Sequence, residues 1–116
     1  MSNNKIFAMP FAKVFPLLIA KAERKGRTRA EVYELTTWLT GYTVAQLDAL
    51  LESDADYGTF LTGMPCPNEN RSKITGSVCG AKLHEIEDPL MLELRRLDKL
   101  VDELAKGKPM DKILRK

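Results

Sequence analysis

The chain has 116 residues, of which 44% are hydrophobic and 29% are charged, and its formal net charge is +2. A chain of this size can bury about 65% of its unfolded surface in one core without disulfides or metals. It contains no run of 18 apolar residues, and residues 1–5 lack the features of a signal peptide. We therefore expect a single domain over residues 1–116, with no membrane segment and a cytoplasmic location.

The first predicted helix lies between about Pro10 and Lys25. Apolar residues recur there at helical spacing and form one continuous stripe. Pro16 falls inside the stripe, so it either kinks the helix or marks its true first turn. Lys25 and Gly26 supply a cation and a left-handed residue for the helix end. The stripe consists of Phe11, Val14, Phe15, Leu18, Ile19 and Ala22.

Two capping boxes in the middle of the chain predict a pair of helices joined by a short turn. They are Thr28-x-x-Glu31 and Thr43-x-x-Gln46, and Gly41 between them provides a left-handed residue. The predicted helices run from about residue 28 to 40 and from about 43 to 52. Such a helix–turn–helix-like unit raises the question of DNA binding.

The outward face of the second helix in this unit argues against DNA reading. A recognition helix needs hydrogen-bond donors for base edges and a positive field for phosphates. This face instead presents two carboxylates, small apolar groups and a glutamine committed to the cap. Simple helix packing is therefore favoured. The outward residues are Val44, Ala45, Gln46, Asp48, Ala49 and Glu52.

The second half of the chain is less regular until its last long helix. Residues 56–61 can add one helical turn, and residues 64–73, rich in Pro and Asn, indicate a loop. For residues 74–86 we expect a short helix or an irregular turn. Asp88 and Pro89 then start a helix to about Lys106, and Pro109 starts a short final helix. No convincing strand pattern is present, so we expect a compact all-α domain of about five helices.

The long helix carries an apolar seam that suggests an interface. Its residues step by four and three over two heptads, as in a coiled coil, although Leu100 widens the stripe. The helix is expected to pack across the first three helices or against a second copy of the chain. The seam residues are Leu90, Leu94, Leu97, Val101 and Leu104.

Charge is segregated along the sequence. Residues 21–29 hold five cations against one acid, whereas residues 30–56 hold six acids and no Lys or Arg. The cations could bind an acidic protein, a phosphate or RNA, or they could be a solvated helix end that complements the helix dipole. This basic segment consists of Lys21, Arg24, Lys25, Arg27 and Arg29.

Candidate catalytic or metal-binding residues are few. Cys66, Cys79 and His84 are the only cysteines and histidine, and their spacing lacks the Cys-x-x-Cys pair of common zinc sites. An enzyme with Cys79 as nucleophile and His84 as base is the least favoured reading, because no third orienting group is evident. Free thiols are favoured over a disulfide. We expect no cofactor and no metal.

Long stretches of the chain resemble an uncharacterised bacterial family, domain of unknown function 2200. The resemblance rests on residues 9–16, 19–28 and 38–43 and, in the second half, on residues 74–80, 85–91 and 97–108. It covers nearly the whole chain and implies a small, single-domain, cytoplasmic bacterial protein. It implies no established activity and no functional residues.

Together these patterns predict a non-enzymatic cytoplasmic module that binds another macromolecule, with a protein favoured. Self-association through the seam of the long helix is one form of that reading. The alternative is a nucleic-acid-binding protein that uses the basic segment, and an enzyme built on Cys79 and His84 comes last. The partner, the oligomeric state and any activity stay open at this level.

Overall fold

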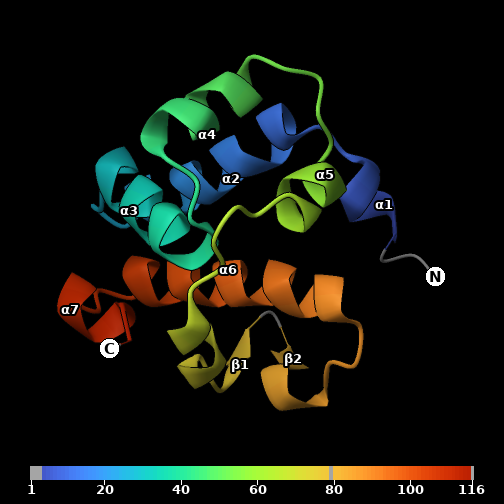
Figure 1. Cartoon of the computed structure of the whole chain (residues 1–116). Helices are drawn as coiled ribbons and strands as arrows, with labels where there is room; N and C mark the ends of the chain where they lie inside the picture. Colours follow the sequence, from blue (N-terminus) through green and yellow to red (C-terminus); the bar gives the residue numbers. More distant parts are fainter. Residues whose placement is uncertain (1–3, 79, 116) are drawn as a thin grey trace.

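The computed structural model describes residues 4–78 and 80–115, which form a largely helical domain measuring 32 × 31 × 26 Å along its principal axes. Helix α6 runs through its middle, with α2–α5 on one side and a small hairpin on the other (Figure 1). The elements are α1 (Asn4–Ala8), α2 (Phe11–Glu23), α3 (Arg29–Thr40), α4 (Val44–Leu51), α5 (Tyr57–Thr62), the 3-10 helix η1 (Glu69–Lys73), β1 (Ser77–Val78), β2 (Ala81–Lys82), the 3-10 helix η2 (Leu83–Glu85), α6 (Pro89–Ala105) and α7 (Met110–Ile113).

The N-terminal helices show how Pro16 is accommodated. Pro16 lies inside α2, which is one continuous helix from Phe11 to Glu23, so Pro16 does not mark the first turn of the helix. The helix ends as expected, because Gly26 has a left-handed φ of 81° and the Arg27 amide donates to the Ala22 carbonyl at 3.0 Å. Helix α1 was not predicted from the sequence, and it packs against α5.

The α3–turn–α4 unit confirms both capping boxes. The Thr28 side chain accepts from the Glu31 amide while the Glu31 side chain accepts from the Thr28 amide. Thr43 and Gln46 repeat the arrangement at the start of α4. Gly41 ends α3 with a φ of 81°, and a Cβ there would lie 2.6 Å from the Cys66 carbonyl oxygen. The turn therefore needs glycine both for its backbone angle and for the loop packed against it.

The loop after α5 is tied to the end of α3. The Cys66 amide donates to the Thr40 carbonyl at 3.1 Å, and the Asn68 amide donates to the Leu39 carbonyl at 3.0 Å. These bonds satisfy carbonyl groups that a helix end leaves without intrahelical donors. The loop thus serves as a backbone cap for α3.

Residues 74–86 differ from the expected short helix or irregular turn. Strands β1 and β2 pair as an antiparallel hairpin, with Val78 opposite Ala81, and η2 follows directly. Gly76 and Gly80 take positive φ angles of 97° and 80°, which favour bends over helix. The strands are too short to show an alternating pattern in the sequence. The fold is mostly helical, as predicted, and the two-stranded hairpin is the part that the prediction lacked.

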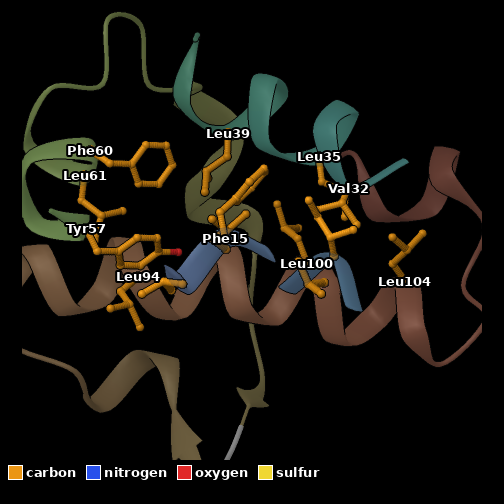
Figure 2. Packing of buried hydrophobic residues seen from close by; sticks show 14 of the residues in the cluster. Phe15, Val32, Leu35, Leu39, Tyr57, Phe60, Leu61, Leu94, Leu100 and Leu104 are labelled. Atoms are coloured by element: carbon orange, nitrogen blue, oxygen red, sulfur yellow. The ribbon is translucent and has the colours of Figure 1, made fainter. Parts of the chain in front are cut away.

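The seam of α6 faces the core of the same chain. Leu97, Val101 and Leu104 are completely buried, Leu94 is 4% exposed, and Leu90 is half-buried against the same core. Figure 2 shows Leu94, Leu100 and Leu104 directed at residues of α3 and α5. Of the two expected arrangements, the helix packs across the other helices of its own chain. A two-heptad seam cannot distinguish these arrangements, because both require the same apolar face.

Candidate functional site

The basic segment does not form one free cationic surface. The Lys21 ammonium lies 3.3 Å from Asp102 Oδ1 on α6, so it joins α2 to the central helix. Arg27 donates to both carboxylate oxygens of Glu31. It also donates to the carbonyl of Leu104 in the last turn of α6 and to the carbonyl of Lys108 just beyond that helix. Carbonyls at a helix C-terminus carry partial negative charge that favours a cation. Both side chains therefore stabilise the fold.

The remaining three cations divide into two types. Arg29 lies over the ring of Tyr33, with 4.8 Å from the guanidinium carbon to the ring centroid, and 3.7 Å from Asp48. Arg24 and Lys25 are exposed, and neither side chain forms an ion pair or hydrogen bond with any residue that the structure describes. Only two of the five cationic side chains in the basic segment are therefore without a partner in the described structure.

A groove of about 490 Å³ lies between α3 and α4, on the surface that the capping boxes organise. Helix α3 supplies one wall and α4 supplies the other. Because Gly41 turns the chain sharply and each Thr cap starts its helix at once, the outward faces of the two helices meet at an angle. The groove is lined by Arg29, Ala30, Tyr33, Glu34, Thr37, Val44 and Asp48.

Tyr33 forms the floor of the groove and links its walls. The Tyr33 hydroxyl donates to Asp48 Oδ1 at 2.6 Å and accepts from Arg29 at the same distance. Its ring meets the edge of Phe15 on α2, with 5.5 Å between the centroids. Burial and the hydrogen bond to Asp48 raise the pKa of Tyr33 above its ordinary value, so the hydroxyl keeps its proton. The floor of the groove is consequently neutral.

The rim of the groove combines exposed apolar surface with negative charge. Val44 is 53% exposed and, with Leu17 on α2, is one of the two large hydrophobic side chains exposed in the described chain. Glu34 and Asp48 stand on opposite walls, and the only cation in the lining is Arg29, already bound to Asp48. An apolar contact point beside unpaired carboxylate charge suits a ligand that is partly apolar and partly cationic.

Sequence reasoning found part of this groove. Val44 and Asp48 were placed on the outward face of the second helix, and Arg29 belonged to the basic segment. Tyr33 was missed because a single tyrosine within an apolar pattern resembles an ordinary core residue. Its spacing of four residues from Arg29 on one helix is the signal that could have revealed the contact.

The residues considered for catalysis or metal binding do not form a site in the described structure. Cys79 lies outside the described residues, so its proposed pairing with His84 has no geometry here. The His84 side chain is 76% exposed, and the Cys66 thiol is free and exposed. Within residues 4–78 and 80–115, no three His, Cys, Asp or Glu side chains are grouped to hold a metal ion. None of the described helices is both long and apolar enough to cross a bilayer.

Comparison with known proteins identifies the family but supplies no activity. The model of a family described as "Uncharacterized protein conserved in bacteria (DUF2200)" matches residues 5–115. The crystal structure of uncharacterized protein SP1917 is similar in fold, with a TM-score of 0.92 and 50% sequence identity over 95% of this chain and 90% of that chain. No curated protein matches the sequence. The chain therefore belongs to the uncharacterised bacterial family DUF2200.

Proposed function

We propose that this protein is a non-enzymatic, cytoplasmic protein-binding module whose docking surface is the groove between α3 and α4. The observation that carries the proposal is the exposure of Val44 beside the Tyr33 floor, within a groove of about 490 Å³. Exposed apolar side chains that line a concave surface are a common feature of protein-binding sites.

The charge of this surface defines the partner. Residues 30–56 contain six acids and no Lys or Arg. Three of these acids already have partners: Glu31 binds Arg27, Asp56 caps α5, and Asp48 binds Tyr33 and Arg29. Glu34 and Asp48 are the acids in the groove lining, and Arg29 is the one cation there. We infer that the occupant is an amphipathic segment of a partner protein with Lys or Arg beside an apolar anchor.

Nucleic-acid binding has less support than protein binding. Phosphate backbones require several free cations, because each contact contributes through the release of a counterion. Of the five side chains in the basic segment, only those of Arg24 and Lys25 lack an ion pair or hydrogen bond within the described chain. Two charges at the end of α2 make a small footprint beside the acidic α3–α4 surface. Salt-dependent binding of DNA or RNA that falls on Arg24→Ala would reverse this ranking.

The proposal can be tested with a peptide probe and nuclear magnetic resonance. The probe is a short amphipathic helical peptide of Leu and Lys, and its counterpart carries Glu in place of Lys. The Lys peptide should shift the amide resonances around Ala30, Tyr33 and Val44, whereas the Glu peptide should not bind. The variant Val44→Asp should abolish these shifts because it places a charge at the apolar contact point.

Leu17→Asp is the matched control. Leu17 is 63% exposed and does not line the groove, so its variant should bind the Lys peptide like the parent protein. Equal binding by the Val44 and Leu17 variants, equal binding of both peptides, or shifts centred outside α3 and α4 would each overturn the proposal. Partners captured from cells should then be lost with Val44→Asp and retained with Leu17→Asp.

A further inference from the structure

Arg29, the cation of the α3–α4 groove, stands at a helix position that the helix dipole disfavours for a cation. It is the first residue of α3, directly after the Thr28 cap. A helix N-terminus carries partial positive charge, so a cation in the first turn is unfavourable there, whereas Glu31 in the same turn has the expected sign. The position of Arg29 is better explained by what its side chain contacts in the groove.

The Arg29 guanidinium lies against an aromatic face, a hydroxyl and a carboxylate at once. Its carbon is 4.8 Å from the centroid of the Tyr33 ring, and Nη2 donates to the Tyr33 hydroxyl at 2.6 Å. The same nitrogen is 3.7 Å from Asp48 Oδ1. A planar guanidinium can stack on a ring and donate to neighbouring oxygens, whereas an ammonium is compact and strongly hydrated. Tyr33 and Asp48 therefore form a subsite that suits arginine better than lysine.

Arg29 is held loosely in this subsite. Its side chain is 55% exposed and that of Asp48 is 53% exposed, and exposed ion pairs contribute little to stability. Arg27 is the contrasting case, because its side chain is 18% exposed and binds Glu31 as well as two backbone carbonyls at the end of α6. Arg29 can therefore leave its contacts at little cost, whereas Arg27 cannot.

The subsite remains formed when Arg29 leaves it. The Tyr33 hydroxyl donates to Asp48 at 2.6 Å, and the ring is buried with its face or edge against Phe15 on α2. Neither contact involves Arg29. Val44 and Asp48 are four residues apart on α4, so the exposed apolar side chain and the carboxylate lie on the same face of that helix. One segment of a partner can contact both.

We propose that Arg29 occupies the place of an arginine of the partner, which displaces it from Tyr33 and Asp48 when the partner docks. The inference rests on the proposed function of the groove and specifies its partner, a segment with an arginine next to an apolar side chain that contacts Val44. Because Arg29 is tethered to the site, it competes with every ligand there and disfavours segments that cannot replace its contacts.

The test compares the Leu–Lys peptide with the same peptide carrying Arg in place of Lys. The parent protein should bind the Arg peptide about threefold more tightly, because only guanidinium reproduces the contacts of Arg29. The variant Arg29→Ala should bind the Arg peptide about fivefold more tightly than the parent, since the internal competitor is gone. Arg24→Ala is the matched control. It removes an exposed arginine outside the groove lining and should leave the affinity unchanged.

Asp48→Asn separates displacement from simple repulsion between cations. The amide keeps an acceptor for the Tyr33 hydroxyl and loses the charge that both arginines need. In this background, Arg29→Ala should change the affinity by less than about twofold, and the preference for the Arg peptide should be lost. Repulsion between Arg29 and the peptide would instead give the same gain with and without Asp48.

Displacement also has a direct spectroscopic signature. When the parent is saturated with the Arg peptide, the Nε–H resonance of Arg29 should move towards that of the exposed Arg24 side chain. An Arg29→Ala variant that binds the Arg peptide as tightly as the parent, or more weakly, would overturn the inference and leave the docking groove standing. Failure of both peptides to bind any of the proteins would remove the proposed function and this inference together.

Discussion

The α3–turn–α4 unit and the segment from residue 63 to 88 are stabilised by different kinds of contact. In the first, each helix start is determined by side chains three residues apart, as in the Thr28–Glu31 and Thr43–Gln46 capping boxes. In the second, side chains also bind partners that are distant along the chain. Arg71 binds Glu93 at 2.9 Å, and the Lys99 ammonium donates to the Ser77 carbonyl at 3.1 Å.

This difference matters for function because the proposed docking groove belongs to the locally determined unit. Its walls begin at side-chain caps and are joined by one turn, and among the described residues the backbone of the 63–88 segment binds α3 only at its last residues, Leu39 and Thr40. The groove should therefore keep its shape when that segment is perturbed. Gly41 is the place where the two regions meet, since it ends α3 and also lies against the backbone of Cys66. Variants can therefore be chosen to disturb one region, the other or their junction.

The largest effect is expected at the junction, from Gly41→Ala. The backbone there has a φ of 81°, and the new Cβ would lie 2.6–2.7 Å from backbone atoms of Cys66. Left-handed strain costs about 1–2 kcal/mol, and displacing the loop should bring the loss in unfolding free energy to about 3 kcal/mol. Urea denaturation measures the loss.

Gly26→Ala is the matched control for that variant. Gly26 has the same φ of 81°, but a Cβ there would meet no atom within 4 Å. Its cost should be the left-handed strain alone, about 1 kcal/mol. If the two variants lose equal stability, the contact between Gly41 and Cys66 does not couple the two regions.

The same contrast explains which parts of the fold could be predicted from the sequence. Caps at Thr28, Thr43 and Asp88 and glycines at helix ends are local signals, and they predicted α3, α4 and α6 correctly. Helix α1 and the β1–β2 hairpin carry no such signal. They are stabilised by packing on α5 and α6, which no short window of sequence contains.

The candidate sites follow a similar rule. The outward placement of Val44 and Asp48 was predictable from helical periodicity. The loss of Lys21 and Arg27 to structural ion pairs was not, because their partners include Asp102 and the Leu104 carbonyl on α6.

A second prediction tests the distant contacts directly. Arg71→Ala removes the guanidinium that binds Glu93 and the Asn68 carbonyl, and it should cost about 1–2 kcal/mol of unfolding free energy. The loss should be uneven. Amide hydrogen exchange should accelerate in residues 64–78 and remain unchanged in α3 and α4.

Lys82→Ala serves as the control within the same segment. Lys82 is exposed in β2 and forms no ion pair with the described residues, so its replacement should change neither stability nor exchange measurably. Faster exchange throughout α3 and α4 in the Arg71 variant would contradict the independence of the two regions. It would also imply that the docking groove depends on the distant segment.

The smallest expected change in stability comes from the two capping boxes, which should differ in how their contribution depends on pH. The hydrogen bond from the Arg27 side chain, and after it the one from the Thr28 amide, lower the pKa of Glu31 from its ordinary 4.5 to about 2. Because the pKa of Glu31 is lower in the folded protein than in the unfolded chain, its carboxylate stabilises the fold at pH values above 4.5. This contribution to the unfolding free energy disappears as the pH falls from 4.5 towards 2. Glu31→Gln keeps an acceptor for the cap and loses only the charge, so it should cost about 0.5–1 kcal/mol at pH 7 and progressively less below pH 4.5.

The second box provides the internal reference for this measurement. Gln46 does not titrate, so the cost of Gln46→Ala, about 0.5–1 kcal/mol, should be the same at pH 7 and pH 3.5. Urea midpoints of the parent and the two variants give both differences at each pH. A cost for Glu31→Gln that does not change with pH would mean that the Arg27–Glu31 pair adds nothing to the cap. Helix α3, and the wall of the groove that it forms, would then be held by the same neutral hydrogen bonds as α4.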